Sequence, residues 1–421
     1  MTTDLTTELE EMGRRARAAS HLLAGFTTMQ KNNALLAVAQ ELELAIDTIL
    51  EANAEDVSRA ESHGLSGAMI DRLRLSPTRI KKMADEVRNV AELPDPVGKQ
   101  LVRWIRPNGI EITKIRVPIG VVGIIYESRP NVTSDAAVLC LKTGNATILR
   151  GGSEAIASNK AIVEALSRGL EESGLPRDSV QLVPTTDRDV VPIMAGMDQY
   201  IDMIVPRGGH ALIEAVVTHA RMPVIKHYHG VCHLFVEQAA DLDMAVDITV
   251  NAKCQRPGVC NALETLLVEE PVAKAFLPLA AKSLKQQGVE LRGDDATRAI
   301  LGDDCLPAEP ADWTAEYLDL ILSIRVVPDF AAAVEHINHY GSHHSDAIVT
   351  ENTMLAEQFL NQIDSATVYW NASTRFTDGN EFGFGAEIGI STDKLHARGP
   401  MGLEELTTYK YQIRGEGQLK Q

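Results

Sequence analysis

The sequence predicts an α/β protein in which doubly wound, mostly parallel sheets form two domains. Beyond about residue 115, short apolar runs typical of strands alternate with amphipathic stretches typical of helices. A second alternating series begins near residue 231. The chain of 421 residues also exceeds the size at which a single hydrophobic core usually stops growing.

The first hundred residues are predicted to be helical, because apolar side chains such as Leu35, Ala39 and Leu42 recur at steps of three and four. Ser76-Pro77 is a favourable helix start, with serine as the cap and proline in the first helical position. In the first alternating series the expected strands are VPIGVVGIIY, NATILRGG, SVQLVP, YIDMIVPRGG and MPVIKHYHG, and the expected helices are SDAAVLCLKTG, SNKAIVEALSRGLEESG and GHALIEAVVTHA. In the second series the expected strands are CHLFVE, ETLLVEE, VELRG and LILSIRVV, and the expected helices are DLDMAVDITVNAKC and PVAKAFLPLAAKSLKQQG.

Residues 103–117, RWIRPNGIEITKIRV, break this alternation. Asn108-Gly109 between two alternating segments is the strongest short-range signal for a β-hairpin. A hairpin inserted into a βαβ series often projects outward and pairs with another chain, and the tail YKYQIRGEGQLK is its expected partner strand. A small surface hairpin without a partner is the alternative.

The net charge of −18 argues against a protein that binds nucleic acids or anionic membranes in general. No apolar run reaches the roughly 18–20 residues that span a bilayer, and the acidic N-terminus lacks the apolar core of a secretion signal. Five scattered cysteines are too few for a disulfide framework. We therefore expect a cytoplasmic protein with free thiols, in which a local group of arginines can still bind a small anion.

Two glycine pairs mark expected strand-to-helix turns: Gly151-Gly152 after Arg150, and Gly208-Gly209 after Arg207. Neither GxGxxG nor a Walker A motif is present. A glycine pair is often only a tight turn, but such a turn also lets backbone N–H groups and a helix N-terminus face an anion. Two such turns, each with an arginine, favour a dinucleotide in a doubly wound sheet.

The cysteines differ in their surroundings. A catalytic thiolate needs access to a cleft, with positive charge or N–H donors nearby. Cys140 lies on a buried helical face, and Cys254 ends an expected helix. Cys260 follows Pro257-Gly258 in an irregular loop, where its side chain can face a cleft. Cys260 is therefore the candidate nucleophile, with core packing as the alternative.

Histidines form two groups: His227, His229 and His233 beside Cys232, and His336, His339, His343 and His344. His227 and His229 would share one face of a strand, which permits metal binding. Neither group has the spacing of a recognised zinc motif, so lining of a polar pocket or exposure at the surface is favoured and no metal is expected.

Three long stretches carry a resemblance to a known family: VPIGVVGIIYESRPNVTSDAAVLCLKTGNATILRGGSEA (117–155), QRPGVCNALETLLV (255–268) and FGFGAEIGISTDKLHARGPMGLEEL (382–406). In the same order, and over nearly the whole chain, the sequence resembles the γ-glutamyl phosphate reductases (glutamate-5-semialdehyde dehydrogenases) of the aldehyde dehydrogenase superfamily. The resemblance implies an aldehyde-dehydrogenase-like fold. Its implied parts are an NADP-binding domain (1–99, 118–228 and 366–402), a catalytic domain (229–365) and oligomerisation strands (100–117 and 403–421).

The resemblance also implies roles for single residues. The catalytic thiol of the superfamily falls on Cys260, whereas Cys254 has no corresponding role. The oxyanion-hole asparagine is placed on Asn131, in a segment that is slightly shorter here. The implied cofactor contacts are Gly208 and Gly209 for the pyrophosphate, Arg150, Ser153 and Glu154 for the adenosine ribose, and Glu316 for the nicotinamide ribose.

One position departs from the oxidative members of the superfamily. They carry a general-base glutamate that activates water against the thioester, and His227 stands at that position here. Loss of the carboxylate fits a reductive direction, in which the thioester must survive until hydride arrives, although a histidine can still act as a base. Arg129, Arg256 and Arg375 are the candidates for binding substrate anions, each with a plain surface arginine as the alternative.

The resemblance implies an NADPH-dependent oxidoreductase that converts L-glutamate 5-phosphate to L-glutamate 5-semialdehyde and phosphate through a cysteine thioester, the second step of proline biosynthesis. Its implied partners are further copies of the chain, as a dimer or tetramer, and the preceding kinase of the pathway. Two alternatives stay open: an oxidative NAD(P)-dependent aldehyde dehydrogenase for a small acidic aldehyde, and a non-catalytic scaffold relative.

Overall fold

The computed structural model describes residues 2–127 and 129–420. Contacts between residues divide the chain into two compact units, each with its own sheet and core. The first unit comprises 1–226, 384–389 and 401–421, and the second comprises 227–383 and 390–400. The stretch 366–402, expected as a whole in the cofactor domain, is thus divided between the two units.

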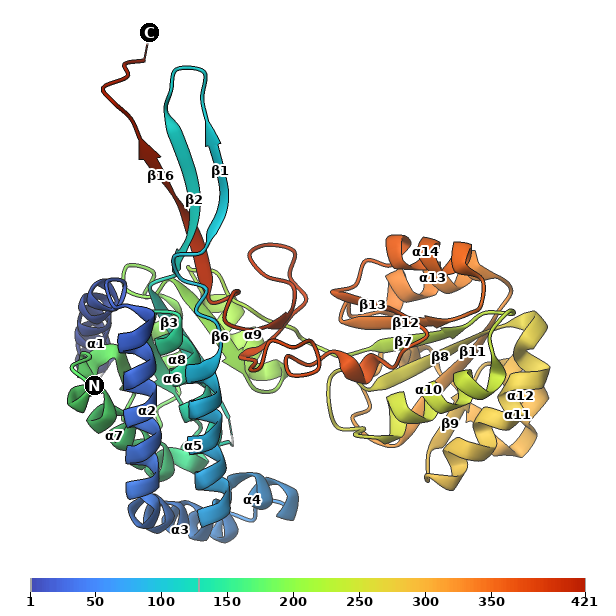
Figure 1. Ribbon diagram of the computed structural model, residues 1–421. Helices are drawn as coiled ribbons and strands as arrows, with labels where there is room; N and C mark the ends of the chain where they lie inside the picture. The colour runs from blue at the N-terminus through green and yellow to red at the C-terminus, as the bar shows by residue number, and fades with distance from the viewer. Residues whose placement is uncertain (1, 128, 421) are drawn as a thin grey trace. The chain divides into compact units, whose positions relative to one another are not determined.

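The first unit opens with five helices (Figure 1): α1 (Thr2–Leu23), α2 (Thr28–Leu44), α3 (Ile46–Ser62), α4 (Gly67–Leu73) and α5 (Pro77–Glu92). The start of α5 is the predicted one, because the Ser76 hydroxyl accepts the Arg79 N–H at 3.2 Å and Pro77 is the first helical residue. The apolar face of α2 buries Leu35, Val38 and further residues against α5 and α7.

A four-stranded parallel sheet forms the centre of the first unit, in the order β5-β4-β3-β6. Its strands are β3 (Val121–Tyr126), β4 (Ala146–Arg150), β5 (Val180–Leu182) and β6 (Met203–Arg207). The segments between and after the strands hold α6 (Asn131–Lys142), η1 (Ser153–Ala155), α7 (Ile156–Glu172), η2 (Arg177–Ser179), α8 (Val190–Ala195) and α9 (His210–His219). Because the chain leaves β3 on one side and returns to its other side as β6, a switch point forms between these two strands, where ligands bind in doubly wound folds.

The strand expected at 222–230 is wrong. Only Val224 forms an isolated bridge, with Ile204 of β6. Pro223 has no N–H to donate to a ladder, and the chain passes from the first unit to the second at residue 227. His227 and His229 therefore do not share the face of a strand.

The expected hairpin is confirmed. Strands β1 (Gln100–Ile105) and β2 (Glu111–Pro118) are antiparallel, and Gly109 between them has the positive φ of 83° that such a turn requires. The tail forms β16 (Thr407–Arg414), which pairs antiparallel with β2 in the order β1-β2-β16. This three-stranded sheet extends away from the helices of the first unit (Figure 1).

The second unit holds a seven-stranded, entirely parallel sheet in the order β10-β9-β11-β8-β7-β12-β13. Its strands are β7 (Cys232–Val236), β8 (Leu263–Glu269), β9 (Glu290–Gly293), β10 (Leu306–Pro307), β11 (Ile321–Val327), β12 (Ser345–Val349) and β13 (Thr367–Trp370). Its helices are α10 (Leu242–Cys254), α11 (Glu270–Gln286), α12 (Asp295–Leu301), η3 (Gly302–Asp304), η4 (Pro310–Thr314), α13 (Phe330–Tyr340), α14 (Thr353–Gln362) and η5 (Thr374–Phe376). A short pair, β14 (Gly389–Ser391) and β15 (Gly399–Met401), lies where the chain crosses between the units.

Both faces of the seven-stranded sheet are covered. One core includes Phe276 and Leu284 of α11 with Leu266 of β8, and the other includes Phe359 of α14 with Phe235 of β7. A strand buried on both faces is mostly apolar, which is why ETLLVEE and CHLFVE are rich in apolar residues, with Glu264 and His233 as buried exceptions. The predicted doubly wound α/β fold is thus confirmed. Among the described residues, no helix is long and apolar enough to cross a bilayer.

Candidate active site

Cys260 lies in the irregular loop that joins α10 to β8. The loop turns at Pro257 and Gly258, and the Ala262 N–H donates to the Val259 carbonyl at 3.0 Å, which closes a second turn around the cysteine. Cys260 is half-buried. The thiol is therefore positioned by a constrained backbone and still accessible to a small molecule.

The first residue of β7 and a glycine just before the strand fix the backbone of Cys260. The Cys232 thiol donates to the Cys260 carbonyl oxygen at 3.2 Å. Gly230 comes so close that a Cβ there would lie 1.8 Å from the same oxygen, so only glycine fits. Sequence reasoning gave neither residue this role; a glycine just before a buried strand is the signal for such a close backbone approach.

The candidate residues of the second unit gather at the amino ends of its strands. Cys260 precedes β8, His227 precedes β7 and His344 directly precedes β12, and these three strands are neighbours in the sheet. Glu316 precedes β11, on the other side of β8. Neighbouring parallel strands begin at the same edge, so residues far apart in the sequence meet there. Ligands more commonly bind at the opposite, carboxyl edge of such sheets.

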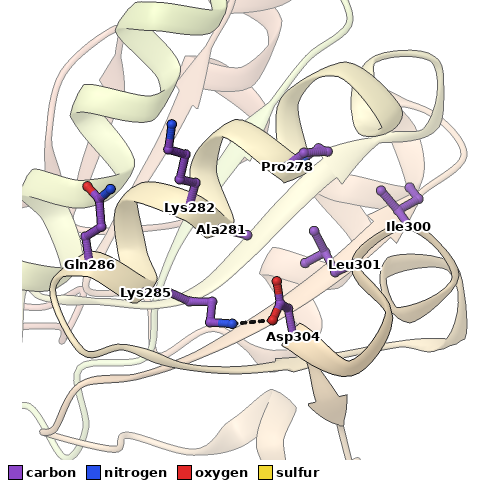
Figure 2. A pocket seen from close by; sticks show the side chains of 8 residues that line it. All are labelled: Pro278, Ala281, Lys282, Lys285, Gln286, Ile300, Leu301 and Asp304. Carbon is purple, nitrogen blue, oxygen red and sulfur yellow. Dashed lines mark hydrogen bonds and ion pairs between the residues drawn. The ribbon is translucent and has the colours of Figure 1, made fainter.

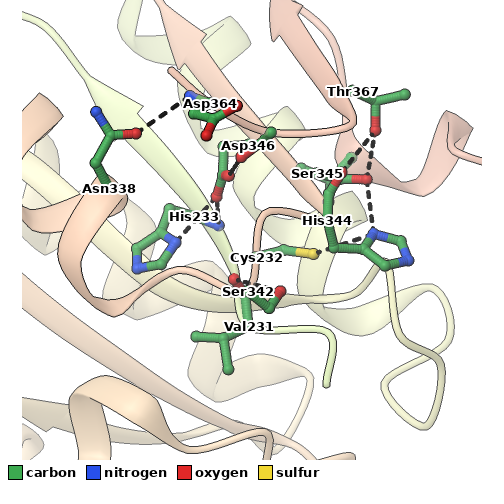
Figure 3. A network of polar contacts seen from close by, with 12 residues as sticks. Val231, Cys232, His233, Asn338, Ser342, His344, Ser345, Asp346, Asp364 and Thr367 are labelled. Atoms are coloured by element: carbon green, nitrogen blue, oxygen red, sulfur yellow. Dashed lines mark hydrogen bonds and ion pairs between the residues drawn. The ribbon is translucent and has the colours of Figure 1, made fainter. Parts of the chain in front are cut away.

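His344 is a site residue that sequence reasoning missed. It is completely buried, and its Nδ1 lies 2.8 Å from Ser345 Oγ and 3.9 Å from Cys232 Sγ (Figure 3). Its buried Nε2 has no hydrogen-bond partner among the described residues. Burial, and to a smaller extent His227, lowers the pKa of His344 to about 3, so its imidazole is neutral near pH 7. One ring nitrogen each of His344 and His227 and the sulfur of Cys260 lie within 4.8 Å of one another.

His227 is oriented by the chain that returns at residue 390. Its Nδ1 lies 3.1 Å from the Ile390 carbonyl oxygen, which can only accept, so Nδ1 carries a proton. The His227 ring meets that of His344 edge-on, with 5.6 Å between ring centroids. The contact thus joins two histidine rings, at the position where the oxidative members of the superfamily carry a glutamate.

Glu316 lies in the loop between η4 and β11. Its Oε1 accepts the Gly230 N–H at 2.8 Å, and its Oε2 lies 3.5 Å from His229 Nδ1. The carboxylate expected at the nicotinamide ribose is thus held by the same glycine that contacts the Cys260 backbone. Two residues later, Leu318 has a φ of 53°, and the Glu264 side chain accepts its N–H at 3.3 Å.

Two of the three candidate arginines are neighbours in the second unit. Arg375 donates from Nε to Gln255 Oε1 at 2.9 Å and from Nη1 to the side-chain oxygen of Asn261. Burial lowers the pKa of Arg375, and the positive charge of Arg256 lowers it further. Two guanidinium groups held close together favour an anionic ligand. Arg129 belongs to the first unit and is exposed.

Arg150 ends β4 in the first unit, at the carboxyl edge of that sheet. It is only 8% exposed, and its Nε has no hydrogen-bond partner among the described residues. Burial lowers the pKa of Arg150, whereas the carboxylates of Glu154 and Glu127 oppose this shift. Ser153, exposed beside it, donates to Glu154 at 3.4 Å. A buried cation with an unused donor fits an anionic or hydroxyl-rich ligand such as a nucleotide.

The N-terminus of α9 lies at the switch point between β3 and β6. The Gly209 N–H there donates to Glu127 Oε2 at 2.9 Å, and a Cβ on Gly208 would lie 2.4 Å from the same oxygen. The helix end is therefore an anion site that a carboxylate of the chain itself fills. Sequence reasoning missed Glu127, although its place directly after β3 at a switch point is the signal that could have marked it.

Asn131, the expected oxyanion donor, is the first residue of α6. Its side-chain amide donates to Asp135 Oδ2 at 2.9 Å. Burial raises the pKa of Asp135 to about 7, and the charge of Glu86 contributes to the rise. The amide is thus already bonded to a carboxyl group that takes up a proton near neutral pH.

The free energy of unfolding of the wild type should fall as the pH rises, because Asp135 loses its proton in a buried place. We expect that Asp135→Asn does not show this fall. The folded pKa is about 7 and the unfolded one about 3.9. Between these values the folded chain binds more protons, so its free energy of unfolding falls up to about pH 7 and then stays low. From pH 5 to pH 8 the variant should gain on the order of 1–3 kcal/mol over the wild type, measured by denaturant unfolding. Asp198→Asn, an exposed aspartate of the same unit, is the control, and equal pH dependence in Asp135→Asn and the wild type would contradict the expectation.

The remaining cysteines are structural. All five cysteines are free thiols. Cys140 is buried in α6, and burial raises its pKa to about 12. Burial also raises the pKa of Cys305 to about 11, and it raises the pKa values of Cys232 and Cys254 as well. Cys254 ends α10 and packs against the core, as its sequence position predicts.

A surface pocket of about 480 Å³ lies elsewhere in the second unit, between α11 and the segment from α12 to η3 (Figure 2). An ion pair between Lys285 and Asp304 closes one side of it. Its lining residues are Pro278, Ala281, Lys282, Lys285, Gln286, Ile300, Leu301 and Asp304. None of the candidate site residues lines this pocket, so it is separate from the site around Cys260.

The second unit thus presents a half-buried thiol at one edge of its sheet, and the first unit has an anion site at the switch point of its own sheet. The sequence pattern of the aldehyde dehydrogenase family matches residues 3–299. The chain belongs to this family.

Within the family, the chain belongs with the γ-glutamyl phosphate reductases, which confirms the resemblance seen in the sequence. The γ-glutamyl phosphate reductase of Moorella thermoacetica is 56% identical over 414 residues, which cover 98% of this chain and 99% of the relative. The crystal structure of the Thermotoga maritima γ-glutamyl phosphate reductase is similar with a TM-score of 0.97 at 48% identity, covering 98% of this chain and 100% of that one. An engineered glycolyl-CoA reductase with bound NADP+ shares the fold, with a TM-score of 0.66, 14% identity and coverage of 96% and 95%.

Proposed function

We propose that the chain reduces L-glutamate 5-phosphate to L-glutamate 5-semialdehyde and phosphate with NADPH, the second step of proline biosynthesis. The observation that carries this proposal is the likeness to γ-glutamyl phosphate reductases over nearly the full length of both chains. A half-buried cysteine in a constrained loop supports it, because the reaction needs a positioned nucleophile.

Cys260 is the proposed nucleophile. Its thiolate adds to the acyl carbon, and the C–O bond to phosphate breaks to leave a thioester. The Cys260 N–H and the Asn131 amide are the proposed donors to the oxyanion, and one such donor lowers the barrier by about 2.7–4 kcal/mol in comparable sites. After reduction, the C–S bond breaks, the thiolate is restored and the aldehyde leaves.

Members of the family use a nicotinamide cofactor, which supplies hydride when bound; NADPH is its proposed form here. We assign the pyrophosphate to Gly208 and Gly209, a role that requires Glu127 to release the Gly209 N–H. The other proposed cofactor contacts are Arg150, Ser153, Glu154 and Glu316. The proposed substrate contacts are Arg129, Arg256 and Arg375.

His227 supports the reductive direction. A carboxylate base at this position would activate water, and water would hydrolyse the thioester before it is reduced. His227 instead keeps its Nδ1 proton on the Ile390 carbonyl and packs against His344. The chain thus places no carboxylate at the position where oxidative relatives hold their base.

The reverse reaction tests the proposal. With semialdehyde, NADP+ and phosphate, the enzyme should form NADPH continuously, because phosphate releases the acyl group from Cys260. Without phosphate, at most one NADPH per active site should form before the thioester stalls. Continuous NADPH formation in phosphate-free buffer would point to an oxidative aldehyde dehydrogenase and contradict the proposal.

We also propose that the chain forms homo-oligomers through the three-stranded sheet. Strand register places Val102, Trp104, Tyr409, Tyr411 and Ile413 on one face of it. All of them except Trp104 are between 51% and 65% exposed. Ile112, Lys114 and Arg116 of the central strand lie on the same face, so two cations stand among these apolar side chains. A large group of exposed apolar side chains supports an interaction surface here. The preceding kinase of the pathway is a further proposed partner, because it would supply the acyl phosphate.

We expect Tyr411→Glu combined with Ile413→Glu to raise the dissociation constant of the oligomer at least about tenfold, because two charges would be buried in the contact. Size-exclusion chromatography with light scattering at several concentrations measures the shift. Met354→Glu replaces a side chain that is 72% exposed in the other unit and serves as the control. A double variant with the mass of the wild type at every concentration would rule out this face.

A further inference from the structure

The cluster of His227, Cys260 and His344 has a property that the reductase reaction does not use. A thiolate and two imidazoles are the ligands that Zn²⁺ prefers, whereas Mg²⁺ and Ca²⁺ prefer oxygen. The three ligand atoms lie within 4.8 Å of one another. In a tetrahedral zinc site the corresponding separations are about 3.4–3.6 Å. Side-chain rotations that close each gap by roughly 1 Å are therefore sufficient.

Both histidines are oriented as metal ligands usually are. Such a histidine binds the metal through one ring nitrogen and uses the other in a hydrogen bond that fixes the ring. His344 Nδ1 lies 2.8 Å from Ser345 Oγ, and His227 Nδ1 lies 3.1 Å from the Ile390 carbonyl oxygen. In His344 the buried Nε2 has no partner among the described residues, so it is available to a ligand.

The surroundings of His344 point to a ligand independently of the distances within the cluster. The residue is 0% exposed, and its buried Nε2 has no partner among the described residues. A buried polar atom without a partner is unfavourable and rare in native proteins.

We propose that Cys260, His227 and His344 form a Zn²⁺ site that blocks the active-site thiol reversibly. Binding exchanges the thiol proton for the metal, so that a sulfur–zinc bond forms and one proton is released without any redox change. The sulfur lone pair is then held by the metal and cannot attack the acyl carbon. Inhibition rests on the proposed role of Cys260, whereas metal binding does not.

Cobalt titration tests binding without any assay of activity. Co²⁺ replaces Zn²⁺ in sites of this kind, and a thiolate ligand gives a charge-transfer absorption. The chelator-treated wild type should show this band with one Co²⁺ per chain, and Cys260→Ala should lack it. His344→Asn should bind at least about tenfold more weakly, and His339→Asn, an exposed histidine of the same unit, should bind like the wild type.

Inhibition is measured with buffered Zn²⁺, each variant being compared with its own metal-free rate. Half-inhibition of His344→Asn should need at least about tenfold more Zn²⁺ than that of the wild type, EDTA should restore the rate, and Mg²⁺ should not inhibit. Equal inhibition of His344→Asn and the wild type, or a cobalt band that survives in Cys260→Ala, would overturn the site. If His344→Asn does not fold, His227→Asn takes its place. If the metal-free enzyme does not reduce the acyl phosphate, the proposed function fails while the cobalt titration still decides on the site.

Discussion

Cys260→Ala is expected to lower the rate of NADPH formation from semialdehyde and phosphate by about 10⁴-fold or more. Without the sulfur no thioester forms, and loss of a nucleophile has an effect of at least this size in well-studied enzymes. Circular dichroism and cofactor binding should be unchanged, because the proposed cofactor contacts other than Glu316 lie in the other unit. A variant that keeps more than about one part in a hundred of the wild-type rate would exclude the thioester mechanism.

Cys254→Ala is the matched control. Cys254 is six positions away in the same segment, is also half-buried and is also a free thiol. It ends α10 and packs against the core, and burial raises its pKa. We expect Cys254→Ala to keep the wild-type rate and to lose on the order of 1 kcal/mol of stability at most. A similar loss of rate in both variants would mean that the loop, rather than one sulfur, is required.

The second large effect concerns stability. Lys253→Met is expected to lower the free energy of unfolding by about 3–5 kcal/mol. Lys253 Nζ lies 2.6 Å from Glu264 Oε2, and both side chains are completely buried. Burial raises the pKa of Glu264 to about 7, and Lys253 is the main group that opposes this rise. Without the lysine, Glu264 must stay charged and unpaired or take up a proton, so the loss should shrink at pH 5.

Two further variants separate charge from packing. Adding Glu264→Gln to Lys253→Met should recover much of the loss, because the amide is neutral and its oxygen can still accept the Leu318 N–H. Lys285→Met removes the ion pair with Asp304 at the surface and should change stability by less than about 0.5 kcal/mol. Equal losses in Lys253→Met and Lys285→Met, measured by denaturant unfolding, would show that the buried pair has no special weight.

Local signals in the sequence predicted much of the fold. Ser76-Pro77 and Asn108-Gly109 specify a helix start and a hairpin turn within a few residues, and both are present. The alternation of polar and apolar residues in the tail predicts a strand that pairs with the hairpin, and β16 does pair with β2. The strand expected at 222–230 failed, because its apolar residues mark a connection between units and Pro223 prevents a regular ladder.

The candidate site was harder to predict from the sequence, because the order of the strands in the sheet determines which residues meet there. Cys260 could be selected by its loop and by the family resemblance. His344 could not, since its nearness to Cys260 depends on β12 lying beside β7 and β7 beside β8. Gly230 matters because it lies close to the backbone of Cys260. Glu127 matters because it accepts a hydrogen bond from the N-terminus of a helix that begins more than eighty residues later. No spacing within a single segment carries this information.

Burial of the other four thiols gives the protein a selectivity toward reagents. Alkylating agents react with thiolates, and a raised pKa keeps Cys140, Cys232, Cys254 and Cys305 protonated near neutral pH. A slow alkylating reagent in small excess should therefore label Cys260 and leave the other four cysteines unmodified, so that each chain carries one label. The amount of label per chain would then count the working molecules in a preparation.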